Sequence, residues 1–96
     1  MSVVVLTKNS IATIQRCLDS LVDQTVHPME ILIVDGGSTD GTLELVRKYH
    51  IRLIKENTSN IGHARNLGVE NAKGEIIFFL DSDCYCVDKW IESILP

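Results

Sequence analysis

Residues 74–83 read Gly-Glu-Ile-Ile-Phe-Phe-Leu-Asp-Ser-Asp, and this stretch decides the fold. Its apolar run at 76–80 is rich in β-branched and aromatic residues, which predicts a strand buried on both faces. The strand ends in Asp81-Ser82-Asp83 and so delivers two carboxylates to one edge of a sheet. Ligands bind at the carboxyl ends of strands in open parallel sheets, and carboxylates there suit a hard cation such as Mg²⁺ or Mn²⁺. The alternative is that Asp83 caps a helix predicted over 87–95.

Strand and helix patterns alternate upstream of this stretch. Strands are predicted at 3–6, at 31–34 and, half-exposed, at 51–55, with helices near 11–24, 43–49 and 62–71. Such alternation specifies an α/β fold: a Rossmann-like parallel sheet of order 3-2-1-4, with right-handed crossovers and helices on both faces.

Glycines and small polar residues predict how the helices begin, pack and end. Asn9 or Ser10 is placed to cap the first helix. In the third helix, Gly68 lets the helix lie close to the sheet, and Gly74 supplies a left-handed stop after it.

Three motifs are expected to meet where the direction of sheet growth reverses. They are Thr7-Lys8 after the first strand, residues 35–38 after the second, and residues 81–83 after the fourth. In the second motif, Asp35 can accept hydrogen bonds from a base or a ribose, and Gly36-Gly37 lets the backbone approach an anion. Neither Gly-x-Gly-x-x-Gly nor Gly-Lys-Ser/Thr is present, which argues against NAD enzymes and P-loop NTPases. The alternative is a tight strand-to-helix turn with Ser38 or Asp40 as N-cap.

Composition excludes several classes of protein. At 96 residues the chain is one domain at most, and 45% hydrophobic with 23% charged residues is typical of a soluble globular protein. A net charge of −4 without a basic stripe argues against nucleic acid as a partner. The three cysteines do not make a disulfide framework, and Cys84-x-Cys86 lacks zinc spacing. With no bilayer-length apolar run and no signal peptide, a cytoplasmic location is expected, with membrane association left open for a longer parent protein.

Several motifs together carry a family resemblance. They stand in the order of the predicted elements and cover nearly the whole chain: Val3-Val4-Val5-Leu6-Thr7-Lys8-Asn9, residues 33–42, residues 60–68, Ala72-Lys73-Gly74-Glu75 and residues 79–83. In this combination they resemble the nucleotide-diphosphosugar glycosyltransferases of GT-A type, specifically family 2. Two features depart from the family pattern: Gly36 stands where many members carry a second Asp, and only His63 separates Gly62 from Ala64.

The resemblance implies a role for each matching residue. Thr7 would line the nucleotide pocket, and Asp35 would hydrogen-bond the uracil or other base. Arg65, in the Ala-Arg-Asn motif, would contact the nucleotide or its phosphates, with a surface ion pair as the alternative. Asp81 would reach the ribose or the cation. Asp83, the last acid of the Asp-x-Asp motif, would ligate the Mn²⁺ or Mg²⁺ that bridges the diphosphate.

The same resemblance implies an inverting sugar transfer of the hexosyltransferase type. A cation neutralises the departing nucleoside diphosphate, and a carboxylate base deprotonates the acceptor hydroxyl. That base and the acceptor site are expected beyond Pro96, so residues 1–96 would be the N-terminal, nucleotide-sugar-binding part of the domain and retain donor binding only. A UDP-sugar is the family's commonest donor, and the sequence names neither the sugar nor the acceptor.

Three other functions remain open: a non-catalytic nucleotide-binding or interaction module, a nucleotidyltransferase, and a phosphatase that uses Asp-x-Asp. No Lys or Pro interrupts the apolar strand edge at 76–80, so this edge can pair with another copy, and a homodimer joined along this strand is also predicted.

Overall fold

The computed structural model describes residues 2–23, 30–49, 51–58 and 60–82. Strands and helices alternate along these residues in the order β1 (Ser2–Thr7), α1 (Ile14–Val22), β2 (Glu30–Asp35), α2 (Thr42–Arg47), β3 (Arg52–Lys55), α3 (Ile61–Asn71) and β4 (Ile77–Asp81). The strands form one sheet of order β3-β2-β1-β4, and every neighbouring pair is parallel. The predicted fold class and strand order are therefore confirmed.

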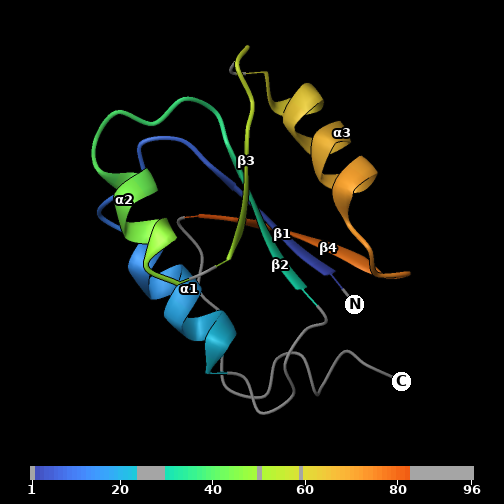
Figure 1. Cartoon of the computed structure of the whole chain (residues 1–96), viewed down its shortest axis with the longest axis horizontal. Coiled ribbons are helices and arrows are strands. Elements are labelled where there is room, and N and C mark those ends of the chain that lie inside the picture. The colour runs from blue at the N-terminus through green and yellow to red at the C-terminus, as the bar shows by residue number, and fades with distance from the viewer. Residues whose placement is uncertain (1, 24–29, 50, 59, 83–96) are drawn as a thin grey trace.

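Helices cover both faces of the sheet. Successive residues of a strand point to opposite faces, so the buried valines of β1 divide between two apolar layers. Val3 and Val5 pack with residues of α1 and α2, whereas Val4 packs with Ala64 of α3. Figure 1 shows α1 and α2 together on one side of the strands and α3 on the other. The prediction of helices on both faces is confirmed.

The outer position of β4 limits its burial. Residues 77–80 of β4 are half-buried, whereas residues 32–34 of β2 are fully buried. Among the described residues β4 pairs only with β1, while β2 lies between β1 and β3. The prediction that residues 76–80 form a strand buried on both faces is therefore wrong for β4, and the fully buried residues lie in β2 and β1 instead.

Gly68 brings α3 close to the sheet, as predicted. A Cβ atom placed on Gly68 would lie 2.7 Å from Val4 Cγ1 and 3.5 Å from Phe79 Cε1. The first of these distances is shorter than van der Waals contact, and Val4 is fully buried in β1. A side chain at position 68 would force α3 away from the sheet.

Gly68→Ala should therefore lower the free energy of unfolding by about 1–3 kcal/mol, the usual cost of overpacking a core. Thermal or urea unfolding measures this loss. Asn66→Ala, at an exposed position of the same helix, is the matched control and should leave stability unchanged or slightly raised because Ala favours helix. Equal stability of Gly68→Ala and the wild type would contradict the close approach.

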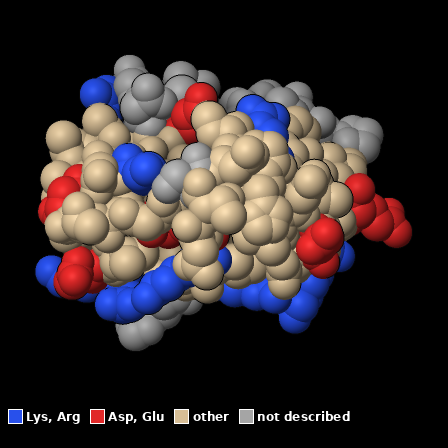
Figure 2. Space-filling view, turned by 90° about the horizontal axis from the view of Figure 1, so that it is seen from above, with Lys and Arg blue, Asp and Glu red and all other residues tan. Residues whose placement is uncertain are grey.

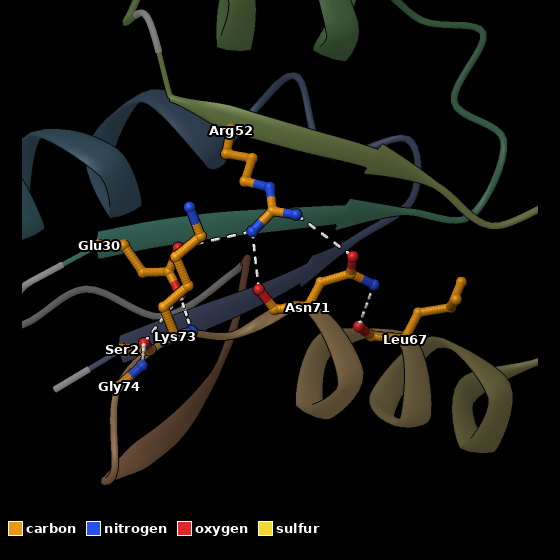
Figure 3. A network of polar contacts seen from close by, with 7 residues as sticks. All are labelled: Ser2, Glu30, Arg52, Leu67, Asn71, Lys73 and Gly74. Carbon is orange, nitrogen blue, oxygen red and sulfur yellow. Dashed lines mark hydrogen bonds and ion pairs between the residues drawn. The ribbon is translucent and has the colours of Figure 1, made fainter.

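Side chains, and not a left-handed glycine, end α3 (Figure 3). The Asn71 amide donates to Leu67 O at 2.8 Å, and the Arg52 guanidinium donates to Asn71 O at 2.7 Å and to Asn71 Oδ1 at 3.2 Å. The Arg52 bond satisfies the carbonyl of Asn71, which the last turn leaves without a helical partner. Ala72 follows in extended conformation, and Gly74 has no positive φ. The predicted left-handed stop at Gly74 is wrong because the network makes it unnecessary.

The start of α1 also differs from the prediction. The helix begins at Ile14, and its N-cap residue, Thr13, makes no side-chain capping bond. Asn9 instead has a positive φ of 50°, and its Oδ1 accepts the N–H of Thr39 at 2.7 Å. Ser10 contributes its carbonyl, which accepts the N–H of Ile14 at 2.8 Å. Neither Asn9 nor Ser10 is the N-cap, because Asn9 joins the loop after β2 and an extra turn follows Ser10.

Charge is mixed on the surface shown in Figure 2, where Lys and Arg side chains lie in several separate groups with Asp and Glu side chains among them. No helix of the described residues has the length and apolar content needed to cross a membrane. The predictions on location and nucleic acid stay predictions.

Candidate active site

A cavity of about 490 Å³ lies at the carboxyl ends of β1 and β4. The chain passes from β1 to β2 on one side and returns to β4 on the other, so this is the point where strand order reverses and where open α/β sheets bind ligands. Thr7, Arg65 and Asp81 line it, as do Gly36 and Glu56. The structure thus brings three of the predicted site residues together from β1, α3 and β4.

A second cavity of about 360 Å³ adjoins the first, and the two share Gly36 and Glu56 as lining residues. Asp35, the fourth predicted nucleotide-binding residue, lines this second cavity together with Lys55 and Asn57. Gly36 lies between them because its N–H donates to Thr7 O at 2.9 Å, which holds the loop after β2 against the end of β1.

Thr7 has a buried hydroxyl with no partner. The residue is 6% exposed, and among the described residues its Oγ1 makes no hydrogen bond. A buried polar atom left unsatisfied costs about 1–3 kcal/mol. Because Thr7 lines the larger cavity, a polar ligand there could satisfy this hydroxyl.

Asp35 closes the loop that follows β2. The residue is 1% exposed, and its Oδ2 accepts the N–H groups of Gly37 and Ser38 at 3.0 and 2.9 Å. Its Oδ1 accepts the Ser38 hydroxyl. Gly37 has a φ of 102°, which a glycine adopts without strain. Asp35 therefore shapes the loop itself, and its predicted contact with the base stays a prediction.

The Arg65 side chain of α3 lies over the ring of Phe79 in β4. Its Cζ lies 5.1 Å from the centroid of the Phe79 ring, within the range of a cation–π interaction. Within the residues that the structure describes, the ion pairs are Arg52–Glu30 and His63–Glu56, and neither involves Arg65. The described residues therefore do not support the alternative that Arg65 forms a surface ion pair. Arg65 lines the larger cavity.

Asp81 is the exposed last residue of β4, paired in register with Leu6. No hydrogen bond or ion pair from another described residue engages its carboxylate, in contrast to those of Asp35 and Glu56. No cluster of three or more candidate metal ligands occurs in the described part of the chain, and Asp83 lies outside that part. Magnesium-type sites commonly use one or two protein carboxylates plus the phosphates of the ligand, so a free Asp81 fits such a cation.

Glu56 lines both cavities, although it is not among the site residues predicted from the sequence. It is 1% exposed, and its carboxylate accepts the N–H groups of Thr58 and Asn60 at 2.8 and 3.1 Å and contacts His63 Nδ1 at 2.8 Å. Hydrogen bonding by the Thr58 hydroxyl, foremost, and by these other donors lowers the pKa of Glu56 from 4.5 to about 2. An acid directly after β3, four residues before the N-cap Asn60, was the available signal.

Glu56 should make stability depend on pH. Because its pKa is lower in the folded than in the unfolded chain, its contribution is present above the unfolded value of 4.5 and is lost as pH falls toward about 2. Glu56→Gln should lower stability at pH 7 and flatten the pH dependence between those values, as measured by urea unfolding at each pH. Glu70→Gln, at an exposed position of α3, should leave the pH dependence unchanged. If the stability of Glu56→Gln depended on pH as steeply as that of the wild type, the lowered pKa of Glu56 would be contradicted.

Known proteins similar to this chain are glycosyltransferases. The family model described as glycosyl transferase family 2 matches residues 2–96. Glycosyltransferase AglE of Haloferax volcanii is 36% identical over 100 residues, an alignment that covers 96% of this chain and 33% of AglE. S. aureus TarS 1–349, solved with UDP-GlcNAc, matches at a TM-score of 0.79 and 37% identity, covering 96% of this chain and 28% of the other. The mannosyltransferase PcManGT of Pyrobaculum calidifontis, solved with GDP-Man and Mn²⁺, matches at a TM-score of 0.80 and 32% identity. The match covers 92% of this chain and 28% of PcManGT. This chain thus spans a third or less of each of these proteins.

Proposed function

The chain belongs to glycosyl transferase family 2, and from this premise we propose that its protein transfers a sugar from a nucleoside-diphosphate donor to an acceptor hydroxyl. The observation that carries the proposal is the convergence of Thr7, Arg65 and Asp81 on one cavity at the point where strand order reverses. Thr7 contributes a hydroxyl that has no hydrogen-bond partner among the described residues, Arg65 a guanidinium that lies over the Phe79 ring, and Asp81 an exposed carboxylate. A sugar nucleotide has a binding partner for each of them: its nucleoside for Thr7, its diphosphate for Arg65, and the cation on the diphosphate for Asp81.

A UDP-sugar is the proposed donor. The similar TarS and PcManGT were solved with UDP-GlcNAc and with GDP-Man, so a sugar nucleotide suits a chain of this fold. Thr7 would give its unpartnered hydroxyl to the nucleoside, and Arg65 would pair with the diphosphate through charge-assisted hydrogen bonds. Asp35 would order the loop beside the base and contact the base.

Asp81 and Asp83 are the proposed ligands of the cation, Mn²⁺ or Mg²⁺. When bound, such an ion neutralises the charge that grows on the departing diphosphate. The chain itself has a net charge of −4 and places the Asp81 carboxylate at the cavity, so it would repel an uncompensated diphosphate. We therefore expect donor binding to depend on the cation.

The acceptor site and the general base are proposed to lie in further parts of a longer protein, because similar glycosyltransferases are at least about three times the length of this chain. Residues 1–96 alone would bind the donor without transferring the sugar. Pairing of β4 with β4 of a second copy also stays a prediction, which light scattering across a dilution series would check.

Product analysis with a panel of donors tests the proposed reaction in the full-length protein. Incubation with UDP-GlcNAc, UDP-glucose or GDP-mannose and a divalent cation should release the nucleoside diphosphate from one of them, and EDTA should stop the release. Pyrophosphate released from a nucleoside triphosphate would instead indicate a nucleotidyltransferase. Phosphate released from a phosphomonoester would indicate a phosphatase, and no turnover of any donor would favour a non-catalytic binding module.

A further inference from the structure

Ser82, the middle residue of the acidic triplet, is buried although Asp81 beside it is exposed. Ser82 is 7% exposed, and its N–H donates to Leu6 O at 3.2 Å, which continues the pairing of β4 with β1 by one residue. Successive side chains along an extended segment point in opposite directions. The Ser82 side chain therefore points inward where the Asp81 carboxylate points out.

The Ser82 hydroxyl meets the loop that follows β1. Its Oγ lies 2.6 Å from Ser10 Oγ, across a separation of 72 residues. Ser10 Oγ also lies 3.3 Å from Lys8 O, to which it can only donate. Either hydroxyl can donate in the bond between them, and Ser82 is the donor when Ser10 gives its single proton to Lys8 O. The two hydroxyls thus connect the acidic triplet to the backbone of the loop that lines the cavity.

Ser10 is itself held in place from the other side. Its N–H donates to Thr42 Oγ1 at 2.9 Å, and that hydroxyl in turn donates to Asp40 Oδ1. Thr42 is fully buried at the start of α2. The partner of Ser82 is therefore a fixed point of the loop, anchored to a helix, and not a side chain free to follow the end of β4.

The backbone of Asp81 is held as well. It pairs with Leu6 in the β1–β4 register, and Cys17 Sγ lies 3.9 Å from Asp81 O as a thiol donor. Together with the Ser82 bond, these contacts hold the end of β4 in place, while no other described residue binds the Asp81 carboxylate. This arrangement is what a metal ligand needs: a rigid attachment and a free head group.

We propose that Ser82 is a positioning residue for the metal-binding carboxylate of Asp81, acting through its hydrogen bond to Ser10. The inference rests on the proposed function, because it presumes that UDP binds with a divalent cation at Asp81. Ser82 lines the same cavity as Asp81, but its hydroxyl is bound to Ser10, and the role proposed for it is to hold the end of β4 and not to bind the nucleotide or the cation. Loss of its hydroxyl would let the end of β4 move relative to the loop after β1, and the cation site would lose its preformed geometry.

The test measures cation dependence separately from nucleotide binding. UDP is titrated by calorimetry into the full-length protein at a series of Mn²⁺ concentrations and in EDTA, for the wild type and for Ser82→Ala. Ser82→Ala should raise the Mn²⁺ concentration for half-maximal enhancement roughly 3- to 10-fold, the usual effect of one hydrogen bond. UDP affinity in EDTA should change less than about twofold, because Thr7 and Arg65 are untouched.

Partner variants separate positioning from mere stability. Ser10→Ala should reproduce the shift, Ser10→Thr should restore wild-type behaviour, and the double Ala variant should be no worse than either single one, since all remove the same bond. Ser20→Ala is the matched control: it removes the hydrogen bond from Ser20 Oγ to Cys17 O, of 2.6 Å, on α1 and should leave the Mn²⁺ dependence unchanged. If Ser82→Ala does not fold, the Ser10 variants carry the test alone.

The failures can be told apart. A Mn²⁺-dependent wild type with an unchanged midpoint in the Ser82 and Ser10 Ala variants would overturn this inference only. Equal losses of UDP affinity with and without Mn²⁺ would show a purely structural serine and overturn it too. If the UDP affinity of the wild type were the same with and without Mn²⁺, both the inference and the metal part of the proposed function would be overturned.

Discussion

Asp81→Ala should abolish the cation-dependent part of UDP binding. The Asp81 carboxylate is exposed, lines the larger cavity and has no partner among the described residues, so a cation would depend on it directly. Removal of one charged ligand should weaken UDP binding in Mn²⁺ roughly 10- to 100-fold, as judged from hydrogen bonds to charged groups. UDP affinity in EDTA should stay the same or rise slightly, because a repelling charge is gone. Asp83→Ala should behave in the same way.

Glu75→Ala is the matched control for Asp81→Ala. It removes the same charge from an exposed position just before β4, at the far end of the strand from the cavity. Its UDP affinity should equal that of the wild type with and without Mn²⁺. A Mn²⁺ dependence that survives in Asp81→Ala would show that other residues hold the cation.

Asp35→Ala should have the second large effect, on both folding and binding. The buried Asp35 carboxylate accepts two backbone N–H groups and the Ser38 hydroxyl of the loop after β2, so its removal takes away the partner of all three donors. The free energy of unfolding should fall by about 2–4 kcal/mol. UDP binding should weaken, because the same loop, at Gly36, lines the larger cavity.

Pyrophosphate separates the two roles of Asp35. If Asp35 contacts the base as the family resemblance implies, Asp35→Ala should weaken UDP binding while pyrophosphate binding stays nearly intact. Equal weakening of both ligands would make Asp35 a purely structural residue. Ser38→Ala, which removes only the hydroxyl bond to Asp35 Oδ1, is the control for loop stability and should destabilise less than Asp35→Ala.

The layout of the site was predictable because it follows from topology. Apolar runs marked the strands, alternation with helices made the sheet parallel, and a strand order of 3-2-1-4 places the ends of β1 and β4 side by side. Thr7 and Asp81 end those strands, so their meeting in one cavity required no knowledge of side-chain geometry.

Several features of the site were not predictable, because they depend on how loops fold or on partners far apart in sequence. Glu56 was not singled out from the sequence, because its burial depends on how the loop before α3 folds over the carboxylate. The bond between Ser10 and Ser82 spans 72 residues. Gly74 follows α3 at a position where a left-handed glycine often ends a helix. The end of α3 depends instead on Arg52 of β3, which donates to the carbonyl of Asn71. Local patterns carry no information on such partners.

Calorimetric titration of UDP into the wild-type protein, with Mn²⁺ and again in EDTA, tests the central claim most directly. The claim is that the cavity at the ends of β1 and β4 binds a nucleoside diphosphate together with a divalent cation at Asp81. The predicted result is UDP binding that is at least about tenfold tighter in Mn²⁺. Equal UDP affinity in the two solutions, or no UDP binding in either, would contradict it.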